Sequence, residues 1–450
     1  MQAPTWCVAI EHNKGYVMDD YRFFSTEEYE QRLNAVREAM GQRGLRGFLV
    51  SRPENIYYLT GLNYQGYFAY QMLVVPLRGT PILITRAMEG ATVRDQVPGM
   101  RHMGYSDGID PLPEPANKAQ DLVLSAQTES GETIGLEPWS MSLGVKTQKD
   151  ERLKPDIMAQ TRITVQAITE LGLTSERLGM EMNSSVLPVN IAQGIFTSLP
   201  EVEWVDASGL VDACRLVQSP LELICTRRAA SISDAMMRAA IQTAGPGVNE
   251  QTIMAAIYHA MLQSGSTYPA FLPLVRSTRT LEHEHGTWSD NLLLNGDYLF
   301  LEMSGCSWRY HAPIGRLVFI GKAPDAAQHI HDVCQAALER AAQRIGPGIK
   351  GQEVYRAWQD CVDQAGLTHY RRHHCGYAVG IGFPPSWSGS GVPIGLRADS
   401  TVELRPGMVF HLMSWLLRTG RGDSFFSDTV VVTEEGCDVL TTTSRDLIVK

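Results

Sequence analysis

The sequence predicts two domains: an α/β domain over residues 1–213 and an α+β domain over residues 214–450. Three observations favour this division. The chain has 450 residues, which is longer than most single domains. Up to about Val205, short apolar runs typical of buried strands alternate with segments that show helical spacing. Beyond Tyr268, strand-like runs follow one another and are separated by tight turns.

The first domain is predicted to combine helices with a partly parallel sheet. A helix begins after Ser25, because the segment STEEYEQRLNAVREAM opens with Ser-Thr and acidic residues and then places apolar residues at helical spacing. Residues 47–50 form a short apolar run, and the segments QMLVVPL and TPILITR are two further buried strands. Residues 131–161 are poorly patterned, and we expect them to be an excursion from this domain.

The second domain is predicted to open with a long amphipathic helix that starts at Ser219–Pro220, in the segment SPLELICTRRAASISDAMMRAAIQTA. Strand-like runs follow in DYLFLEMSG, WRYHAPIGRLVFIG, GMVFHLMSWLL and FFSDTVVVTEEG. Two more helical stretches, residues 325–344 and 352–365, lie between them. The pattern indicates an antiparallel sheet with helices on one face.

Composition excludes several classes of partner. The formal net charge is −10, whereas nucleic acids and anionic membranes require a basic surface, so neither partner is expected. The eight cysteines are scattered without a CxxC pair, which is typical of reduced thiols. Residues 1–20 lack the pattern of a signal peptide, and no apolar stretch has the length of a membrane span. We therefore expect a cytoplasmic protein.

Several segments resemble the creatinase/aminopeptidase P family, whose catalytic domain has the pita-bread fold. In the second half they are LVQSPLELICTRRAA, NGDYLFLEMSG, LRPGMVFHLM and SDTVVVTEEG, and in the first half NIYYLTGLNYQGYF. The resemblance covers most of the chain. It implies an N-terminal α/β domain of the creatinase type and a C-terminal pita-bread domain that carries the active site.

The resemblance also locates the positions at which the peptidases of this family bind two metal ions through five side chains. Carried over one at a time, these positions fall on Glu302, Pro313, Tyr377, Met413 and Ser427. A divalent cation needs several converging oxygen or nitrogen ligands. Four of the five positions have lost their ligand, so we expect no metal of the family type and no other cofactor.

Histidine and cysteine side chains could form a replacement metal site. The candidates are His283, His285, His311, His373, His374 and Cys375. Their spacing, His-x-His and His-His-Cys, is not a specific zinc pattern. Surface or core histidines are the simpler interpretation, and we favour it.

Within the family, the segments GDYLFLEMSG, WRYHAPIGR, GYAVGIGFPPSW and RPGMVFHLM are most similar to those of the ectoine hydrolases. One departure is Phe383, where this resemblance leads us to expect tyrosine. The resemblance implies a hydrolase that opens a C–N bond of ectoine or a related cyclic amidine, and hence a small zwitterionic substrate.

Glu302 is the candidate catalytic residue for such a substrate. The ring carbon of a protonated cyclic amidine is electrophilic, and a carboxylate can pair with the amidinium and then attack the carbon or activate a water. Glu302 is the one carboxylate at a former metal position; the alternative is a Glu that only forms a salt bridge in the sheet. The resemblance to creatinase assigns the acid/base histidine to His285, with His283 as a competitor.

Five further residues are candidates for substrate binding. His411 alternates with Met413 and Trp415 along one strand, so all three should face the site, although core packing is the simpler role for Trp415. By the same alternation His311 shares a face with Pro313. Tyr377, Trp387 and Trp288 could offer aromatic faces to a small cation, or could be core residues.

The resemblance further implies a homodimer in which the N-terminal domain of one subunit reaches the site of the other. The matching segment is LNYQGYFAYQ, and Tyr67 is its candidate contact residue.

Two alternatives to an amidine hydrolase stay open. One is a creatinase-like hydrolase of another small guanidino or acylated amine. The other is a non-catalytic pita-bread module like those of histone chaperones, although these carry long acidic tails and the C-terminal segment TTTSRDLIVK is short and of mixed charge.

Overall fold

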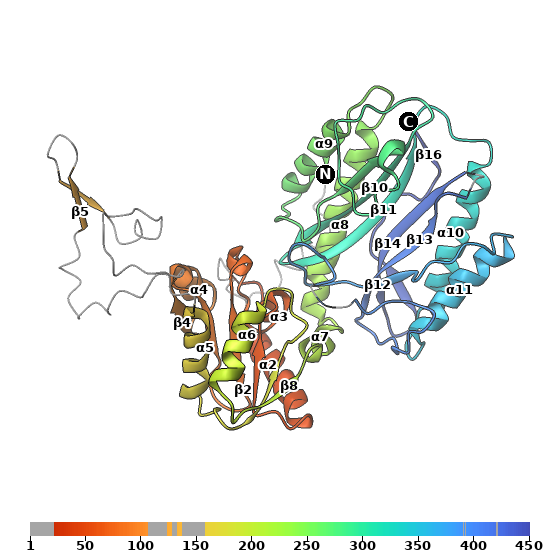
Figure 1. The fold of residues 1–450 in the computed structure, drawn as a ribbon. Coiled ribbons are helices and arrows are strands. Elements are labelled where there is room, and N and C mark those ends of the chain that lie inside the picture. Colours follow the sequence, from red (N-terminus) through yellow and green to blue (C-terminus); the bar gives the residue numbers. More distant parts are fainter. Residues whose placement is uncertain are drawn as a thin grey trace, which may run out of the picture. The chain divides into compact units, whose positions relative to one another are not determined.

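The computed structural model describes residues 22–106, 124–127, 133–136 and 158–450, without residues 390, 392, 420 and 421. The chain divides into two compact units, Met1–Val211 and Asp212–Lys450. The division falls two residues before the predicted boundary between residues 213 and 214. Each unit is a sheet with its own set of helices (Figure 1).

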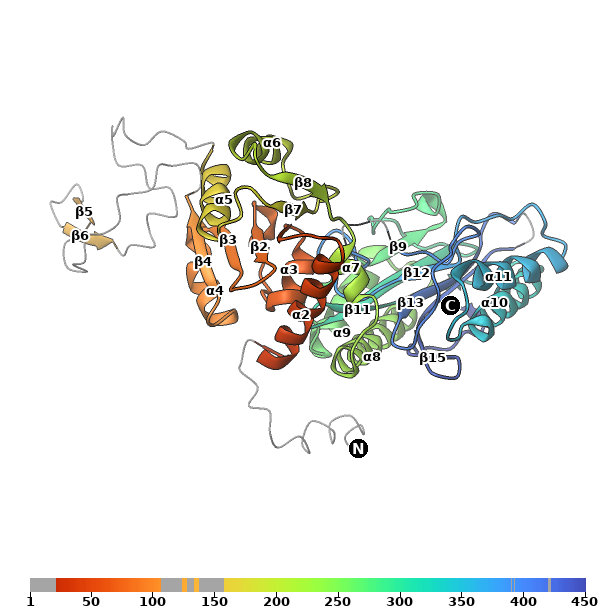
Figure 2. The same ribbon diagram turned by 90° about the horizontal axis from the view of Figure 1, so that it is seen from below.

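The N-terminal unit is built on a six-stranded mixed sheet (Figure 2). Its strands are β1 (Gly47–Val50), β2 (Met72–Pro76), β3 (Ile82–Arg86), β4 (Arg101–Tyr105), β7 (Arg177–Met180) and β8 (Glu203–Asp206). They lie in the order β4-β3-β2-β1-β7-β8. The pairs β1–β2 and β2–β3 are antiparallel and the other three are parallel, which confirms the predicted partly parallel sheet.

The helices of this unit connect those strands. They are α2 (Thr26–Gln42), α3 (Pro53–Thr60), α4 (Gly90–Gln96), α5 (Ala159–Glu170) and α6 (Val189–Ser198), with short 3-10 helices η1 (Gly66–Phe68) and η2 (Ala87–Glu89). The predicted N-cap of α2 is confirmed: the Ser25 side chain accepts a hydrogen bond of 3.3 Å from the backbone N–H of Glu28. α7 (Leu210–Arg215) contains the division between the units.

The predicted excursion at residues 131–161 lies for the most part outside the described residues. Within and before it, β5 (Leu124–Gln127) and β6 (Thr133–Leu136) form an antiparallel pair, and α5 begins near its end.

The C-terminal unit is built on an eight-stranded sheet. Its strands are β9 (Leu274–Ser277), β10 (Tyr298–Ser307), β11 (Tyr310–Phe319), β12 (Gly376–Ala378), β13 (Val409–Leu416), β14 (Ser424–Val432), β15 (Cys437–Val439) and β16 (Ile448–Val449). The order is β12-β13-β14-β11-β10-β9, with β15 beside β14 and β16 beside β11. All pairs are antiparallel except β11–β16, as the run of strands and tight turns predicts.

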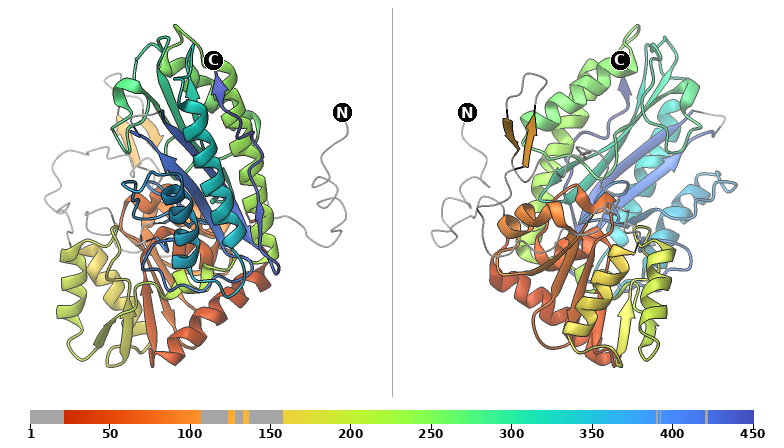
Figure 3. Two further views of the ribbon diagram at one scale, coloured as in Figure 1. Left: turned by 90° about the vertical axis from the view of Figure 1, so that its right-hand side faces the viewer. Right: turned by 60° about the vertical axis from the view of Figure 1, so that its left-hand side comes forward.

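Four long helices accompany this sheet: α8 (Pro220–Thr243), α9 (Glu250–Gln263), α10 (Ala327–Arg344) and α11 (Gly351–Gln364). Figure 3 shows the long strands with these helices packed along them. Leu301 of β10 packs in a cluster with residues of α8 and α9, and Leu412 of β13 packs in another with residues of α10 and α11.

Strand register shows that both helix pairs cover the same face of the sheet. Glu302 lies opposite Gly315, Gly315 opposite Ser427, and Ser427 opposite Met413, so these four residues form one row across β10, β11, β14 and β13. Residues directly opposite one another in a sheet share a face, and chain neighbours point to the other face. Leu301 and Leu412 therefore point to the helices, and the row of four points away from them. We call the side that carries this row the open face.

The predicted start of α8 is confirmed, and a residue of its cap also bonds to the sheet. Ser219 and Glu222 form a capping box. The second carboxylate oxygen of Glu222 accepts a hydrogen bond of 2.6 Å from the Tyr310 hydroxyl of β11.

Among the residues that the structure describes, no helix is both long and apolar enough to cross a lipid bilayer.

We predict that Gly315→Ala destabilises the C-terminal unit. A Cβ atom at this position would lie 2.2 Å from Cε1 of Phe425 and 2.6 Å from Oγ of Ser427. The Phe425 ring stacks on Phe300 with centroids 4.5 Å apart, so it has little room to move. Overpacking of this kind costs about 1–3 kcal/mol, and the melting temperature should fall measurably in a thermal unfolding scan.

Gly346→Ala is the matched control in the same unit. A Cβ atom there meets nothing closer than 3.9 Å, so the melting temperature should stay within about a degree of the wild-type value, because the change adds no clash. Equal effects of the two substitutions would contradict this account of Gly315.

Candidate active site

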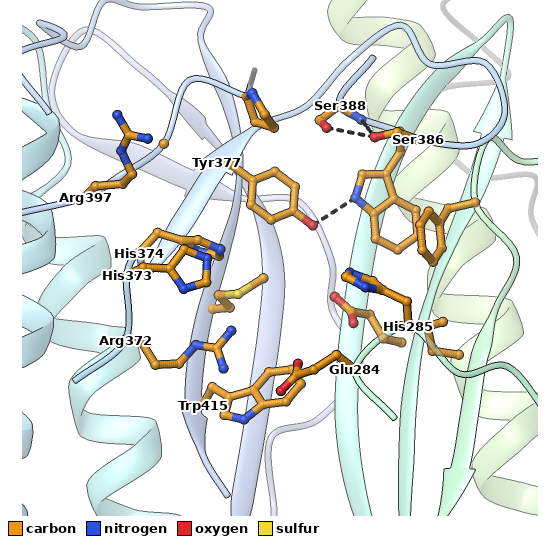
Figure 4. Close-up of a pocket in the computed structure, with 17 residues that line it drawn as sticks. Glu284, His285, Arg372, His373, His374, Tyr377, Ser386, Ser388, Arg397 and Trp415 are labelled. Atoms are coloured by element: carbon orange, nitrogen blue, oxygen red, sulfur yellow. Dashed lines mark hydrogen bonds between the residues drawn. The ribbon is translucent and has the colours of Figure 1, made fainter. Parts of the chain in front are cut away.

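A pocket of about 340 Å³ lies on the open face of the C-terminal sheet. Its floor is formed by strand residues, among them Glu302 of β10 and Met413 and Trp415 of β13. The segment between α11 and β12 supplies one wall and the loop after β9 supplies another. Figure 4 shows Arg372, His373, His374 and Arg397 on one side and Glu284 and His285 on the other. The pocket thus has a basic side and a side with an acidic residue.

The Glu302 carboxyl group is buried, with 6% of the residue exposed. Burial raises its pKa from 4.5 to about 7, because the charged form loses its hydration. The guanidinium groups of Arg276 and Arg372 act in the opposite direction, and the Glu284 carboxylate adds to the rise. Near neutral pH this group can therefore gain or lose a proton, as a catalytic acid or base must.

A chain of hydrogen bonds leads from Trp387 towards Glu302. The indole N–H of Trp387 donates to the Tyr377 hydroxyl oxygen at 3.0 Å, and this oxygen lies 3.1 Å from Nδ1 of His411. Burial lowers the pKa of His411 to about 3, so its ring is neutral. The arrangement that satisfies all three groups has Tyr377 donating to Nδ1, which leaves the hydrogen of His411 on Nε2.

Nε2 of His411 faces the catalytic candidate: it lies 3.7 Å from Oε1 of Glu302. Because the imidazole is neutral, this contact is not an ion pair. Nε2 is buried and has no hydrogen-bond partner among the described residues, so its N–H lies beside the carboxyl group without a bond to it.

The loop after β9 is held in place by Arg276. The guanidinium group of Arg276 donates to the backbone carbonyls of Leu281 and His283, and it stacks 4.2 Å from the centre of the Phe300 ring. The loop then presents Glu284 and His285 to the pocket. Of the two histidines proposed as acid/base, His285 lines the pocket and His283 does not.

The remaining predicted binding residues are distributed as follows. Tyr377 and Trp387 line the pocket, and His411 lies directly behind Tyr377. His311 and Trp288 do not line it. The His311 ring is fully buried, and its Nε2 accepts a hydrogen bond of 2.9 Å from the N–H of Ala270.

Trp288 packs against Tyr258 of α9, with ring centroids 6.3 Å apart, and belongs to the core between α8, α9 and the sheet. Tyr67 belongs to the N-terminal unit, in η1.

Sequence alternation identifies the face of a strand but not which residues at a strand end are covered by a loop. This explains why His311, which shares the face of the site, does not line the pocket.

Sequence reasoning missed Arg372, Arg397 and Glu284. Neither arginine belongs to a residue type that the family motifs contain at a ligand position. Arg372 nevertheless stands five residues before Tyr377 in the segment RRHHCGY. That cluster of arginine and histidine residues next to a former ligand position was the available signal. Trp415, for which core packing was the simpler expectation, also lines the pocket.

The five positions that correspond to metal ligands do not fit a dimetal centre. Glu302, Ser427 and Met413 lie in one row on the open face, so the geometry of the row is retained. The donors are one carboxylate, one hydroxyl, one thioether and the phenol of Tyr377, and Pro313 has none. Such a set lacks the converging carboxylates and imidazole that hold two divalent cations. In the described part of the chain, no three His, Cys, Asp or Glu side chains are grouped so as to hold an ion.

Comparison with known proteins accounts for both units. Residues 224–434 match the model of metallopeptidase family M24, and residues 32–160 and 144–217 match the creatinase/prolidase N-terminal domain. The chain belongs to the creatinase/aminopeptidase P family. This confirms the predicted creatinase-type N-terminal domain and pita-bread C-terminal domain, and at this level the chain is a hydrolase of the M24 family.

Relatives within the family differ in their chemistry. Ectoine hydrolase of Halomonas elongata is 26% identical over 95% of this chain and 98% of its own length. Dipeptidase PepE of Mycobacterium ulcerans has a similar structure, with a TM-score of 0.71, 22% identity and coverage of 95% and 99% of the two chains. Xaa-Pro dipeptidase of Bacillus anthracis is similar with a TM-score of 0.72, 20% identity and coverage of 94% and 100%. These two structures establish the shared fold.

We predict that Glu302→Gln stabilises the protein increasingly as the pH rises. A carboxyl group whose folded-state pKa exceeds its unfolded-state value contributes stability that is present below the unfolded pKa and is lost as the pH rises through the folded pKa. For Glu302 this window runs from 4.5 to about 7. The difference in unfolding free energy between variant and wild type should therefore grow across this window, by up to about 3 kcal/mol.

Thermal or denaturant unfolding of both proteins between pH 4 and pH 8 measures this difference. A difference that stays constant, or that shrinks towards pH 8, would contradict the burial of an ionisable group at Glu302. Gly346→Ala serves as a control, because it changes no ionisable side chain and its effect on stability should not depend on pH in this way.

Proposed function

We propose that this protein is a metal-independent hydrolase that opens a C–N bond of ectoine or a related cyclic amidine, with Glu302 as nucleophile or general base. The observation that carries the proposal is the buried Glu302 carboxyl group, whose pKa is raised to about 7, at the floor of a pocket that holds both basic and acidic side chains. The similarity to ectoine hydrolase over nearly the whole chain supports the choice of substrate.

The geometry suits a small zwitterion with an amidinium group. The Glu302 carboxylate offers the negative charge that an amidinium requires, in a site where desolvation strengthens the attraction. Two aromatic side chains, Trp387 and Phe271, lie with ring centroids 4.9 Å apart and planes at 47°, and both line the pocket, so a cationic ring can pack against them. The pocket volume is at the small end of ligand sites.

Hydrolysis of the amidine requires a new C–O bond at the ring carbon and a proton on the departing nitrogen. The Glu302 carboxylate either forms the C–O bond itself, giving an intermediate that water then cleaves, or removes a proton from the attacking water. The neutral His411 lies beside this carboxylate, with its Nε2 3.7 Å from Oε1 of Glu302. We assign to His285, which lines the wall formed by the loop after β9, the return of a proton to the leaving nitrogen.

The proposal assigns no step to a metal ion, because the side chains at the family's ligand positions do not fit one. In their place Glu302 supplies the charge and the proton transfer that a metal-bound hydroxide supplies in a metallohydrolase. A guanidino or acylated amine substrate would use the same residues, and the size of the pocket alone does not favour it over a cyclic amidine.

We predict that Glu302→Gln lowers kcat for ectoine by at least about 100-fold, while the variant still binds the substrate, because the amide keeps the shape of the side chain and loses its basicity. In the wild type, kcat/KM should rise as the pH increases through about 7, since the deprotonated carboxyl group is the active form. Turnover is measured by NMR of substrate and product, and binding by calorimetry.

Wild-type protein dialysed against a chelator serves as the control and should keep its turnover, with no stoichiometric transition metal in elemental analysis. Normal turnover by Glu302→Gln would remove the role proposed for this residue. Loss of turnover on chelation, restored by added metal, would remove the proposed metal independence.

We also propose that the protein acts as a homodimer, with the Tyr67 segment of one subunit reaching the site of the other. Support comes from the family, and from the sequence NYQGYF that precedes β2. Sedimentation should show a dimer, and Tyr67→Ala should lower turnover without lowering the melting temperature of the C-terminal unit. A monomer with full turnover would contradict the proposal.

A further inference from the structure

A second cavity of about 370 Å³ adjoins the pocket on the same unit. The two cavities share three lining residues, Glu284, Arg372 and Trp415. Arg372 therefore stands where the pocket opens into this outer cavity. Its side chain is at the basic side of the pocket, across from Glu284 and His285 (Figure 4).

Four arginines line the two cavities, and three of them are already paired. Arg371 pairs with Asp363 at 2.5 Å, Arg397 with Asp399 at 3.2 Å and Arg418 with Glu282 at 3.7 Å. Among the described residues, no carboxylate lies within ion-pair distance of Arg372, and its Nε atom is buried without a hydrogen-bond partner. Buried guanidinium N–H groups are normally paired. This arginine is thus a charged donor without an acceptor, at the mouth of the pocket.

The side chain and backbone of Arg372 are both held in position. Its guanidinium carbon lies 4.4 Å from the centre of the Trp415 ring, a stacked cation–π arrangement. The hydroxyl of Tyr355, on α11, donates to the backbone carbonyl of Arg372 at 2.6 Å. Gln359 of the same helix donates to the carbonyl of Tyr370 at 2.7 Å. A guanidinium group fixed in this way loses little conformational entropy when it binds a ligand.

The other basic side chains of the pocket are weaker candidates for binding an anion. Burial lowers the pKa of His374 to about 3, and it also lowers the pKa of His373, so both rings are neutral at physiological pH. The Nε atom of Arg397 also lacks a hydrogen-bond partner, but it lies 3.2 Å from Oδ1 of Asp399, so the charge of Arg397 is already paired. Arginine keeps its charge even when it is partly buried.

We propose that Arg372, stacked on Trp415, binds the carboxylate of the substrate and makes this carboxylate a requirement for productive binding. The inference rests on the proposed function, which places the amidinium of the substrate at Glu302. With its two charged ends held by Glu302 and Arg372, a zwitterion can enter the pocket in one orientation only. A guanidinium group is planar and forms two parallel N–H···O bonds to a carboxylate, which fixes direction as well as charge.

One structural role competes with this assignment. Arg372 could instead serve to hold Glu284, which lies across the pocket: burial lowers the pKa of Arg372, and the exposed Glu284 carboxylate acts in the opposite direction. In that case Arg372 and Glu284 act as a pair that positions the His285 loop. Removing either partner would then have the same effect on every ligand.

The test compares binding of ectoine and of the same methylated ring without its carboxylate, by calorimetry in the Glu302→Gln background. With Arg372 present, ectoine should bind about 10- to 100-fold more tightly than the ring alone, the range expected for a charge-assisted pair. Adding Arg372→Met should bring this ratio close to one without weakening the binding of the bare cationic ring. Arg372→Lys should keep part of the ratio, because it retains the charge but loses the fork.

Two variants serve as controls. Arg371→Met removes a neighbouring arginine that is already paired, and the ratio should stay at its starting value. Glu284→Gln should also keep the preference for the carboxylate. An equal loss of both ligands in Arg372→Met, reproduced by Glu284→Gln, would overturn the proposal in favour of the loop-holding role.

The role of Arg372 can also be tested if ectoine is not the substrate. If neither ring binds the starting protein, the proposed substrate fails, and acetate replaces it as a probe of Arg372 alone. Acetate should then change the tryptophan fluorescence of the protein saturably in the wild type, with sodium chloride as the ionic-strength control, and not in Arg372→Met. The absence of a saturable change in the wild type would overturn the role of Arg372 as a carboxylate site.

Discussion

Removing the Glu302 carboxyl group from water raises its pKa to about 7, and the nearby arginines only partly offset the cost of burying its charge. The groups around Glu302 are arranged about this buried carboxyl group. Arg276 is buried between the Phe300 ring and the loop that carries His285, so the same cation compensates the carboxylate and shapes a wall of the pocket. His411 is kept neutral by burial and turns an N–H, not a full charge, towards Glu302.

The fold lets the side chains of the site change because the sheet keeps their positions. The row from Glu302 through Gly315 and Ser427 to Met413 is set by backbone pairing of four strands, and backbone pairing does not depend on which side chains point from it. The helices pack on the other face, so the side chains of the open face do not take part in helix packing. A pita-bread domain can therefore lose converging metal ligands and still present a pocket at the same place.

Residues with strong local signals were predicted well. Ser25 and Ser219 are helix caps because a short polar side chain followed by an acidic residue satisfies the free N–H groups of the first turn, and that interaction is local in sequence. Met413 and Trp415 share a face because alternation along a strand is also local. Tyr377 and Glu302 could be placed through family motifs that lie beside them in the chain.

The sequence by itself determined the two architectures, the family and the identity of one buried carboxylate, because periodicity, caps and motifs act over a few residues. Only the tertiary structure decided which side chains meet that carboxylate. Arg372 and Trp415 are distant in the chain and come together because the segment that leads into β12 runs beside β13, where the N–H of Met413 donates to the carbonyl of Cys375. His311 shares the alternation of the site strand, yet its ring bonds to Ala270 instead, since a covering loop is a long-range contact that alternation cannot reveal.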